Sequence, residues 1–384
     1  MEIVVAGGGM AGLTVAALLG RTGSHQVTVL ERAPEYSDAG YGIGLYPLGA
    51  AVFHALGRYD ELRNRSSVLD RYEVHGPNGD TLQSVDLGEL LAPFGPMLGV
   101  SRTDLIELLA TSVGDGIIHF GAEARAVTQS GDRLVVETAG GGSFDADIVV
   151  AADGMNSALR SSLFGEVEPH DTGFDAWMWW VPSGSTPDGT ASEYWGPSVF
   201  VGLYPILDHV NVAVAVPRSL TPDRGASPEN IVGALRSVVA EHASGAASLP
   251  GLFDIGDSAP FLWPMTDVRA PDITACSDRL ALVGDSGIGF LPTAGVGASN
   301  ALRSAAALAY ELSLADAQSA PVAVRRWHAR VKPVVTANQH DSRELARVMM
   351  VEHASASAVI NAVMKHVPVT SITKGIVKSM GAPF

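Results

Sequence analysis

The residues with the clearest chemical potential form a glycine pattern near the N-terminus. Gly7, Gly9 and Gly12 follow a short apolar run and precede an Ala/Leu-rich segment with helical character. In this context G-x-G-x-x-G binds a dinucleotide, because its glycines permit a tight turn, a close backbone approach to the pyrophosphate and close helix packing. The free N–H groups at the helix start also favour negative charge. The pattern therefore predicts a nucleotide site that includes Met10 and Ala11.

An acidic residue completes this unit. Residues 26–31 are expected to form a second strand, which ends at Glu31, 19 residues after Gly12. A carboxylate in this place accepts hydrogen bonds from an adenosine ribose and repels a 2′-phosphate. Glu31 and the adjacent Arg32 are therefore predicted to contact the cofactor, although this motif alone does not separate NAD from FAD.

A second glycine-rich segment, residues 284–297, favours a flavin. Asp285 follows a buried-type strand and has the chemistry to accept hydrogen bonds from ribityl hydroxyls, although it can also be an ordinary turn cap. Gly295, Val296 and Gly297 leave backbone N–H groups at the start of a long Ala-rich helix. Such a positive helix end suits the negative N1/O2 edge of a reduced flavin. We therefore predict FAD as the cofactor.

With these motifs the chain resembles the single-component FAD-dependent aromatic monooxygenases, typified by para-hydroxybenzoate hydroxylase. The resemblance extends from residue 1 to about residue 345. The matching pieces, in order, are Gly7 to Gly12 with Glu31-Arg32, residues 40–47, Arg102 at a helix start, Asp153-Gly154 through Ser157 and Arg160, and residues 284–297. The chain departs from the family pattern at Ser286-Gly287, Ser299 and Arg303-Ser304.

The resemblance implies both a fold and an activity. The fold would be α/β, with a Rossmann-like FAD-binding domain of the glutathione-reductase type, an inserted antiparallel substrate sheet and C-terminal helices. NADH or NADPH would reduce FAD, and a flavin C4a-hydroperoxide would hydroxylate, or less often epoxidise, an electron-rich aromatic or polyketide-like small molecule. By position, Gly42, Arg102 and Asp285 would hold FAD, Asp153 would lie near the cofactor and the nicotinamide, and Pro292 would border the site of oxygen transfer.

An aromatic strand is the first candidate for the substrate side. Residues 176–182 contain three tryptophans, of which Trp177 and Trp179 share one face of a strand. That face can stack on a planar substrate or can be ordinary sheet core. The segment also nearly matches the W-x-W-x-I-P signature of flavin-dependent halogenases. Halogenation is disfavoured, because the sequence has lysines only at positions 332, 365, 374 and 378, all in the C-terminal region.

Electrophilic attack on a phenol is helped by a group that takes up the phenolic proton. Tyr204 is the first candidate for this role, with Tyr194 and His209 behind it, and each can instead be purely structural. Tyr194 and Tyr204 are also predicted to contact substrate. The alternatives left open are a flavin oxidase or reductase on the same fold and a flavin-binding protein without turnover.

The elements that must position these residues divide into three groups. An FAD-binding domain is predicted from residues 1–70, 98–170 and 266–345, and a substrate-binding domain from residues 71–97 and 171–265. Residues 346–384 would form a C-terminal helical tail. A helix is expected to start at Ser101, which with Asp104 three residues on resembles a capping sequence. The segment 321–366 is predicted to be mostly helical, with a break near Pro333.

Composition limits the other classes of function. The net charge of −16 disfavours nucleic acid as a partner, and the single cysteine, Cys276, excludes an intramolecular disulfide and any multi-cysteine metal site. No metal is predicted. The sequence lacks an apolar run of roughly 18 residues and a basic N-terminal leader, so a cytoplasmic protein without a membrane span is expected. The partners expected are an aromatic small molecule, O2 and NAD(P)H, in a monomer or homodimer.

Overall fold

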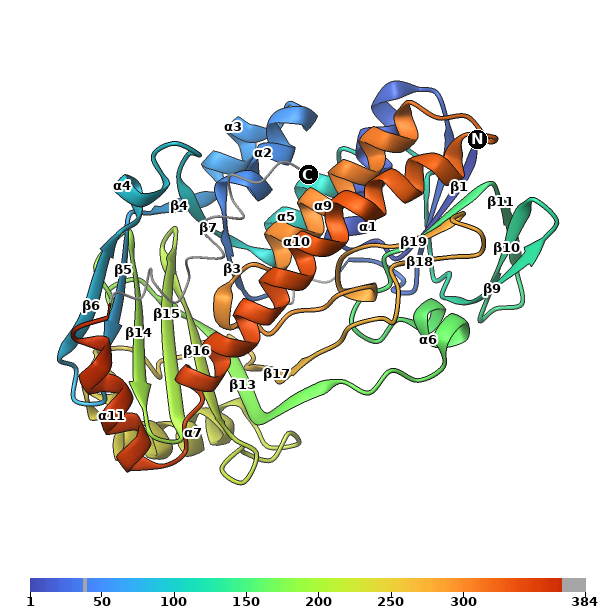
Figure 1. Ribbon diagram of the computed structural model, residues 1–384. Helices are drawn as coiled ribbons and strands as arrows, with labels where there is room; N and C mark the ends of the chain where they lie inside the picture. Colours follow the sequence, from blue (N-terminus) through green and yellow to red (C-terminus); the bar gives the residue numbers. More distant parts are fainter. Residues whose placement is uncertain (37–39, 368–384) are drawn as a thin grey trace.

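A mostly parallel β-sheet, whose strands come from separate parts of the chain, forms one part of the fold. The computed structural model describes residues 1–36 and 40–367 (Figure 1). Five of the six strands in this sheet are parallel, and β18 is antiparallel to its neighbour. In spatial order they are β18 (Thr274–Ala275), β19 (Leu280–Leu282), β12 (Ile148–Ala151), β1 (Glu2–Ala6), β2 (Gln26–Glu31) and β8 (Ile118–Phe120).

Alternate side chains of this sheet enter two different cores. Ile3 and Val5 pack on a helical layer, whereas Val4 and Ala6 pack on a small antiparallel sheet. The helical layer contains α1 (Met10–Thr22), α5 (Arg102–Ala110) and α9 (Gly297–Ser313). The small sheet contains β9 (Ala124–Ser130), β10 (Arg133–Thr138) and β11 (Ser143–Ala146). The carboxyl end of β1 lies between these layers, and from there the chain turns into α1.

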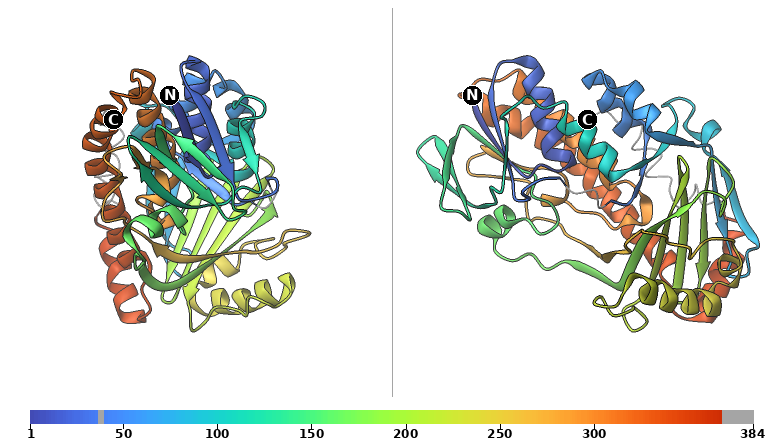
Figure 2. Two further views of the ribbon diagram at one scale, coloured as in Figure 1. Left: turned by 90° about the vertical axis from the view of Figure 1, so that its right-hand side faces the viewer. Right: turned by 180° about the vertical axis from the view of Figure 1, so that it is seen from behind.

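The second large sheet is mostly antiparallel and has seven strands. They are, in spatial order, β17 (Phe261–Asp267), β13 (His170–Pro182), β16 (His209–Pro217), β15 (Val199–Ile206), β14 (Thr190–Gly196), β5 (Arg71–His75) and β6 (Thr81–Asp86). Helix α7 (Pro228–His242) covers its outer face, as Figure 2 shows. A third sheet of β3 (Gly42–Leu45), β7 (Met97–Ser101) and β4 (Ser66–Leu69) contacts β15.

Helix α10 (Ala320–Met349) extends from the parallel sheet toward the second large sheet (Figure 1). The predicted break near Pro333 is wrong, because the helix continues through this exposed proline. Buried side chains on both sides of it, among them Trp327, Val331 and Val335, hold the helix against the core and offset the lost backbone hydrogen bond.

The remaining elements are shorter. They are α2 (Pro47–Leu56), α3 (Tyr59–Asn64), α4 (Leu87–Leu91), α6 (Ala158–Phe164), α8 (Ser244–Ala247), α11 (Ala354–Met364), η1 (Gly284–Ser286) and η2 (Pro292–Ala294). Most of the predicted tail after Met364, including Lys374 and Lys378, lies outside the described residues. None of the helices in the described part of the chain is long and apolar enough to cross a membrane. The predicted fold class, a parallel FAD-type sheet with an antiparallel sheet and C-terminal helices, is confirmed.

Candidate active site

The turn between β1 and α1 is built from glycines that have different neighbours. Gly7 has φ +106°, and a Cβ there would collide with the carbonyl group of Ala152. A Cβ on Gly12 would collide with the carbonyl oxygen of Gly7. By contrast, a Cβ on Gly9 would meet no atom within 4 Å, and Gly9 is the N-cap of α1. Gly7 and Gly12 therefore shape the turn, whereas Gly9 leaves open space beside a positive helix end.

Glu31 closes this turn from the end of β2. Its carboxylate accepts hydrogen bonds from the backbone N–H of Gly8 at 2.7 Å and of Ala33 at 2.8 Å. The nearby Tyr36 hydroxyl is buried and has no hydrogen-bond partner among the described residues. Burial raises the pKa of Tyr36, the Glu31 charge raises it further, and the Arg102 charge opposes the rise. Tyr36 therefore offers a hydroxyl to a ligand at this turn, although no sequence motif predicts this role. Arg32, the other residue predicted here, has an exposed side chain.

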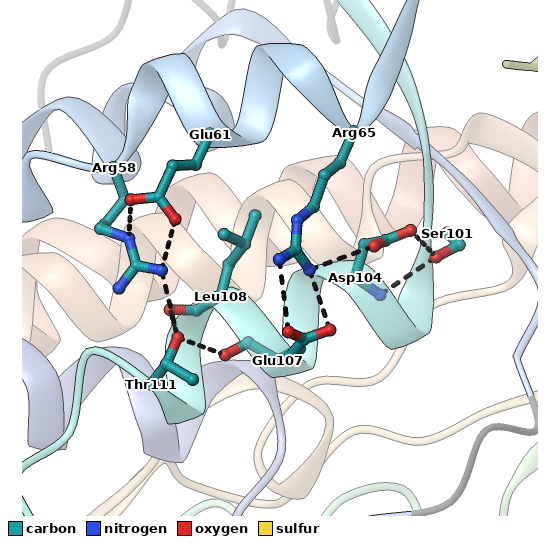
Figure 3. Close-up of polar contacts among 8 residues, drawn as sticks. All are labelled: Arg58, Glu61, Arg65, Ser101, Asp104, Glu107, Leu108 and Thr111. Carbon is teal, nitrogen blue, oxygen red and sulfur yellow. Dashed lines mark hydrogen bonds and ion pairs between the residues drawn. The ribbon is translucent and has the colours of Figure 1, made fainter.

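Arg102 is positioned by the capped start of α5. Ser101 accepts a hydrogen bond from the backbone N–H of Asp104 at 3.0 Å, which is the capping arrangement that the sequence predicts. Figure 3 shows that Arg65, directly after α3, contacts Asp104 and Glu107 and so ties the two helices together. Arg102 thereby faces the region between Tyr36 and Tyr41, since its charge acts on both hydroxyls.

A cavity of roughly 290 Å³ lies between the parallel-sheet region and the second large sheet. The predicted cofactor residues on its wall are Met10, Gly42, Asp285, Gly295 and Gly297, and Pro292 lies there too. Val296 is buried as the N-cap of α9. Tyr204 lines the same cavity from β15. The structure therefore brings the second glycine-rich segment and Tyr204 to one enclosed space.

Asp285 presents its carboxyl group to this cavity from η1. The side chain forms no hydrogen bond with any described residue, and burial raises the pKa of Asp285 to about 6, against the opposing charge of Arg160. A partly desolvated carboxylate without donors is costly. Ribityl hydroxyl groups of a bound flavin would satisfy it.

Asp153 is directed at its own chain instead. Its carboxylate accepts hydrogen bonds from the Ser157 hydroxyl at 2.6 Å and the Leu159 N–H at 3.1 Å. Arg160 then donates to the carbonyl oxygens of Ser286 at 3.0 Å and Met155 at 2.6 Å. This motif therefore fastens α6 to the segment that carries Asp285, and Asp153 is not among the cavity-lining residues.

Trp177, Trp179 and Tyr194, which the sequence predicted to contact substrate, do not line this cavity. All three belong to the core between the second sheet and α7. The indole N–H of Trp177 donates to Thr221 at 2.9 Å, and that of Trp179 donates to the Leu252 carbonyl oxygen at 3.0 Å. Because successive strand residues point to opposite faces, the neighbouring residues of β13 and β14 line the cavity. These neighbours are Ala176, Met178 and Glu193.

Glu193 is a site residue that the sequence interpretation missed. Its side chain is 4% exposed and accepts three hydrogen bonds. The donors are the Tyr72 hydroxyl at 2.6 Å, the Tyr204 hydroxyl at 2.8 Å and the Trp195 indole N–H at 3.0 Å. The available signal was a single acidic residue inside the otherwise uncharged strand segment 190–196.

The residues present fit FAD. An open backbone position at Gly9, an unpaired Tyr36 hydroxyl, and the donor-free Asp285 carboxyl offer the groups that a pyrophosphate, a hydroxyl and a ribityl chain need. Gly9, Glu31 and Arg102 would hold the nucleotide half, and Asp285 with Gly295 would hold the flavin half.

Comparisons with known proteins show the family of this chain. The model of the FAD binding domain family matches residues 1–341. The 3-amino-4-hydroxybenzoate 2-monooxygenase PtmB3 of Streptomyces platensis is 32% identical over 353 residues, which are 89% of this chain and 87% of that protein. The aurachin C monooxygenase/isomerase of Stigmatella aurantiaca is 29% identical over 333 residues, which are 86% of this chain and 84% of that protein.

A solved structure shows the same fold. HpxO of Klebsiella pneumoniae, complexed with FAD and uric acid, superposes with a TM-score of 0.87 at 21% identity, over 99% of this chain and 96% of that one. The family match and the relatives together establish the class of the protein. The chain belongs to the FAD binding domain family and is an FAD-dependent monooxygenase that acts on aromatic compounds.

Proposed function

We propose that this protein uses NADH or NADPH and O2 to hydroxylate, or less often epoxidise, an electron-rich aromatic or polyketide-like small molecule held in the cavity. For hydroxylation, substrate, O2, NAD(P)H and a proton give the hydroxylated product, NAD(P)⁺ and water. Bound FAD supplies the redox chemistry, since it accepts the hydride and, once reduced, activates O2 for transfer of one oxygen atom.

One observation carries this proposal. A single cavity joins the cofactor-side residues Asp285 and Pro292 to the second sheet at Tyr204. A substrate on the sheet side would therefore share a mostly apolar space with the flavin, in which the access of water is reduced. Pro292 borders the position of oxygen transfer.

Tyr204 is the proposed proton acceptor for a phenolic substrate. Its hydroxyl donates to Glu193 at 2.8 Å, so its oxygen can receive a proton from the substrate while its own proton moves toward the carboxylate. This movement would raise the electron density of the ring at the moment of attack.

The test is a turnover assay on the purified, FAD-loaded protein. NADH and NADPH oxidation, O2 uptake and peroxide release would be followed across a panel of phenols, N–H heterocycles and polycyclic aromatics, including 3-amino-4-hydroxybenzoate because a relative is named for it. Substrate-stimulated NAD(P)H oxidation with hydroxylated product and little peroxide supports the proposal. Stoichiometric peroxide with every compound indicates a flavin oxidase instead.

A matched pair of variants tests the role of Tyr204. Tyr204→Phe should lower kcat on the order of 100-fold with a phenol and leave FAD binding unchanged. Tyr194→Phe is the control, because that ring lies on the opposite face of the sheet. Equal activity of the two variants would remove Tyr204 from the mechanism.

A further inference from the structure

The acidic and basic side chains on the described cavity wall are carboxyl groups without a basic partner on that wall. Among the described residues that line it, Glu193 and Asp285 are the only carboxyl groups, and none is Lys, Arg or His. Asp285 lies at the cofactor side and Glu193 at the sheet side. Burial raises the pKa of Glu193, and the hydrogen bonds from Tyr72, Trp195 and Tyr204 oppose this rise by holding the ionised form, which makes the potential at the sheet side negative. A negative potential in an apolar enclosure disfavours a second negative charge, because little solvent is present to screen it.

The tyrosines at this wall present acceptors to the cavity. Tyr72 and Tyr204 each donate their hydroxyl hydrogen to Glu193, and Tyr46 donates to the Ala294 carbonyl oxygen at 3.2 Å. A hydroxyl has one hydrogen and two lone pairs, so each oxygen keeps accepting capacity after its hydrogen is used. The polar groups at the sheet side therefore suit a ligand that donates hydrogen bonds.

The rest of this side is apolar and adaptable. Its lining includes leucines and several methionines, whose flexible thioether chains fit irregular shapes. The methionines are Met97, Met178, Met265, Met349 and Met350. An aromatic carboxylate bound among them would lie in an apolar enclosure near Glu193, at a cost of several kcal/mol.

We propose that Glu193 is a specificity-determining residue, through which the cavity selects neutral aromatic substrates that donate a hydrogen bond and discriminates against aromatic carboxylates. The favoured class is a phenol, enol or N–H heterocycle with apolar substituents. This inference rests on the proposed function, because it names the substrate class of the same cavity.

The test compares each acid with its methyl ester by equilibrium binding to the FAD-loaded protein. The pairs are 3-amino-4-hydroxybenzoate and 4-hydroxybenzoate with their methyl esters, and the signal is perturbation of the flavin absorption spectrum. We expect each ester to bind at least about tenfold more tightly than its acid, which is about 1.4 kcal/mol. Equal or tighter binding of the acids, or no detectable binding of either ester, overturns the inference.

Two variants assign the discrimination to Glu193. Glu193→Gln keeps the side-chain size and removes the charge, so the preference for ester over acid should fall to less than about threefold. Glu73→Gln is the matched control, because Glu73 lies on β5 outside the cavity lining, and it should keep the full preference. Unchanged discrimination in Glu193→Gln excludes Glu193 as its source.

A second comparison remains informative if Glu193→Gln does not fold. The wild-type protein should bind methyl 4-hydroxybenzoate at least about tenfold more tightly than methyl 4-methoxybenzoate, which lacks the donor, and Tyr204→Phe should reduce this ratio. Equal binding of the phenol and its methyl ether by the wild-type protein overturns the inference.

Binding and turnover separate the two proposals. Selective binding of the esters without any hydroxylated product would refute the monooxygenase function in this cavity and leave the selectivity standing. Efficient hydroxylation of the free acids would support the monooxygenase function and refute the selectivity for neutral substrates.

Discussion

Two carboxyl groups face the same cavity from opposite sides, and their surroundings differ. Glu193 accepts hydrogen bonds from Tyr72, Tyr204 and Trp195, so the protein satisfies it completely. Asp285 forms no side-chain hydrogen bond with any described residue, and only the charge of Arg160 opposes the effect of its burial on the pKa. The first carboxyl organises the wall, whereas the second is left open to a ligand. The difference shows that two carboxyl groups on one cavity can have different roles, because their hydrogen-bond partners differ.

Removal of Glu193 should produce the largest effect. Glu193→Ala leaves two hydroxyls and one indole N–H without their acceptor, and each unsatisfied group costs about 1–3 kcal/mol. The free energy of unfolding of the apoprotein, measured with urea, should therefore fall by at least about 3 kcal/mol. Asp285→Asn, which removes a donor-free carboxylate, should instead raise it at neutral pH, by up to about 3 kcal/mol, because burial disfavours the charged form that this carboxyl takes there. Comparable losses in both variants would remove the distinction between the two carboxyls.

The stability of the apoprotein should depend on pH through Asp285. Burial raises the pKa of Asp285 from 3.8 to about 6, so folding takes up a proton between these values. Consequently this carboxyl makes the folded state less stable as the pH rises through that window, by up to about 3 kcal/mol. The slope of unfolding free energy against pH should be shallower in Asp285→Asn and in the FAD-loaded protein. Parallel curves for all three would contradict the prediction.

The β1–α1 turn gives a test at the nucleotide end. Gly9 has extended backbone angles and open space around it, so Gly9→Val should fold normally while its side chain blocks the approach of a pyrophosphate. We expect FAD affinity to fall at least about 100-fold, or about 2.7 kcal/mol, by equilibrium dialysis.

Gly20 in the same helix supplies the control for Gly9. A Cβ on Gly20 likewise meets no atom within 4 Å, and the residue is exposed. Gly20→Val should therefore bind FAD as the wild-type protein does. If Gly9→Val also retained full affinity, the cofactor would not approach this turn.

The sequence predicted the local motifs better than it predicted which side chains of the second large sheet line the cavity. The turn at Gly7 and the cap at Ser101 depend on neighbouring residues, so their geometry can be read from spacing. Alternation along a strand shows which side chains share a face, but α7 and the cofactor-side segments decide which face meets the cavity. For that reason the sequence pattern pointed to Tyr194, whereas its neighbour Glu193 lines the cavity. The domain division, the coenzyme and the roles of the site residues stay predictions.

The smallest expected effects test the assignment of the two faces of β13. Trp177→Phe loses the hydrogen bond to Thr221, so the free energy of unfolding should fall by about 1–2 kcal/mol, while the Kd of a bound phenol should stay unchanged. Met178→Leu conserves volume, and stability should change by less than about 1 kcal/mol, yet the Kd should shift about threefold because Met178 lines the cavity. Urea unfolding and flavin-monitored titration measure the two quantities on the same preparations. The opposite pattern, with ligand affinity sensitive to Trp177 and not to Met178, would place the substrate on the α7 side of the sheet.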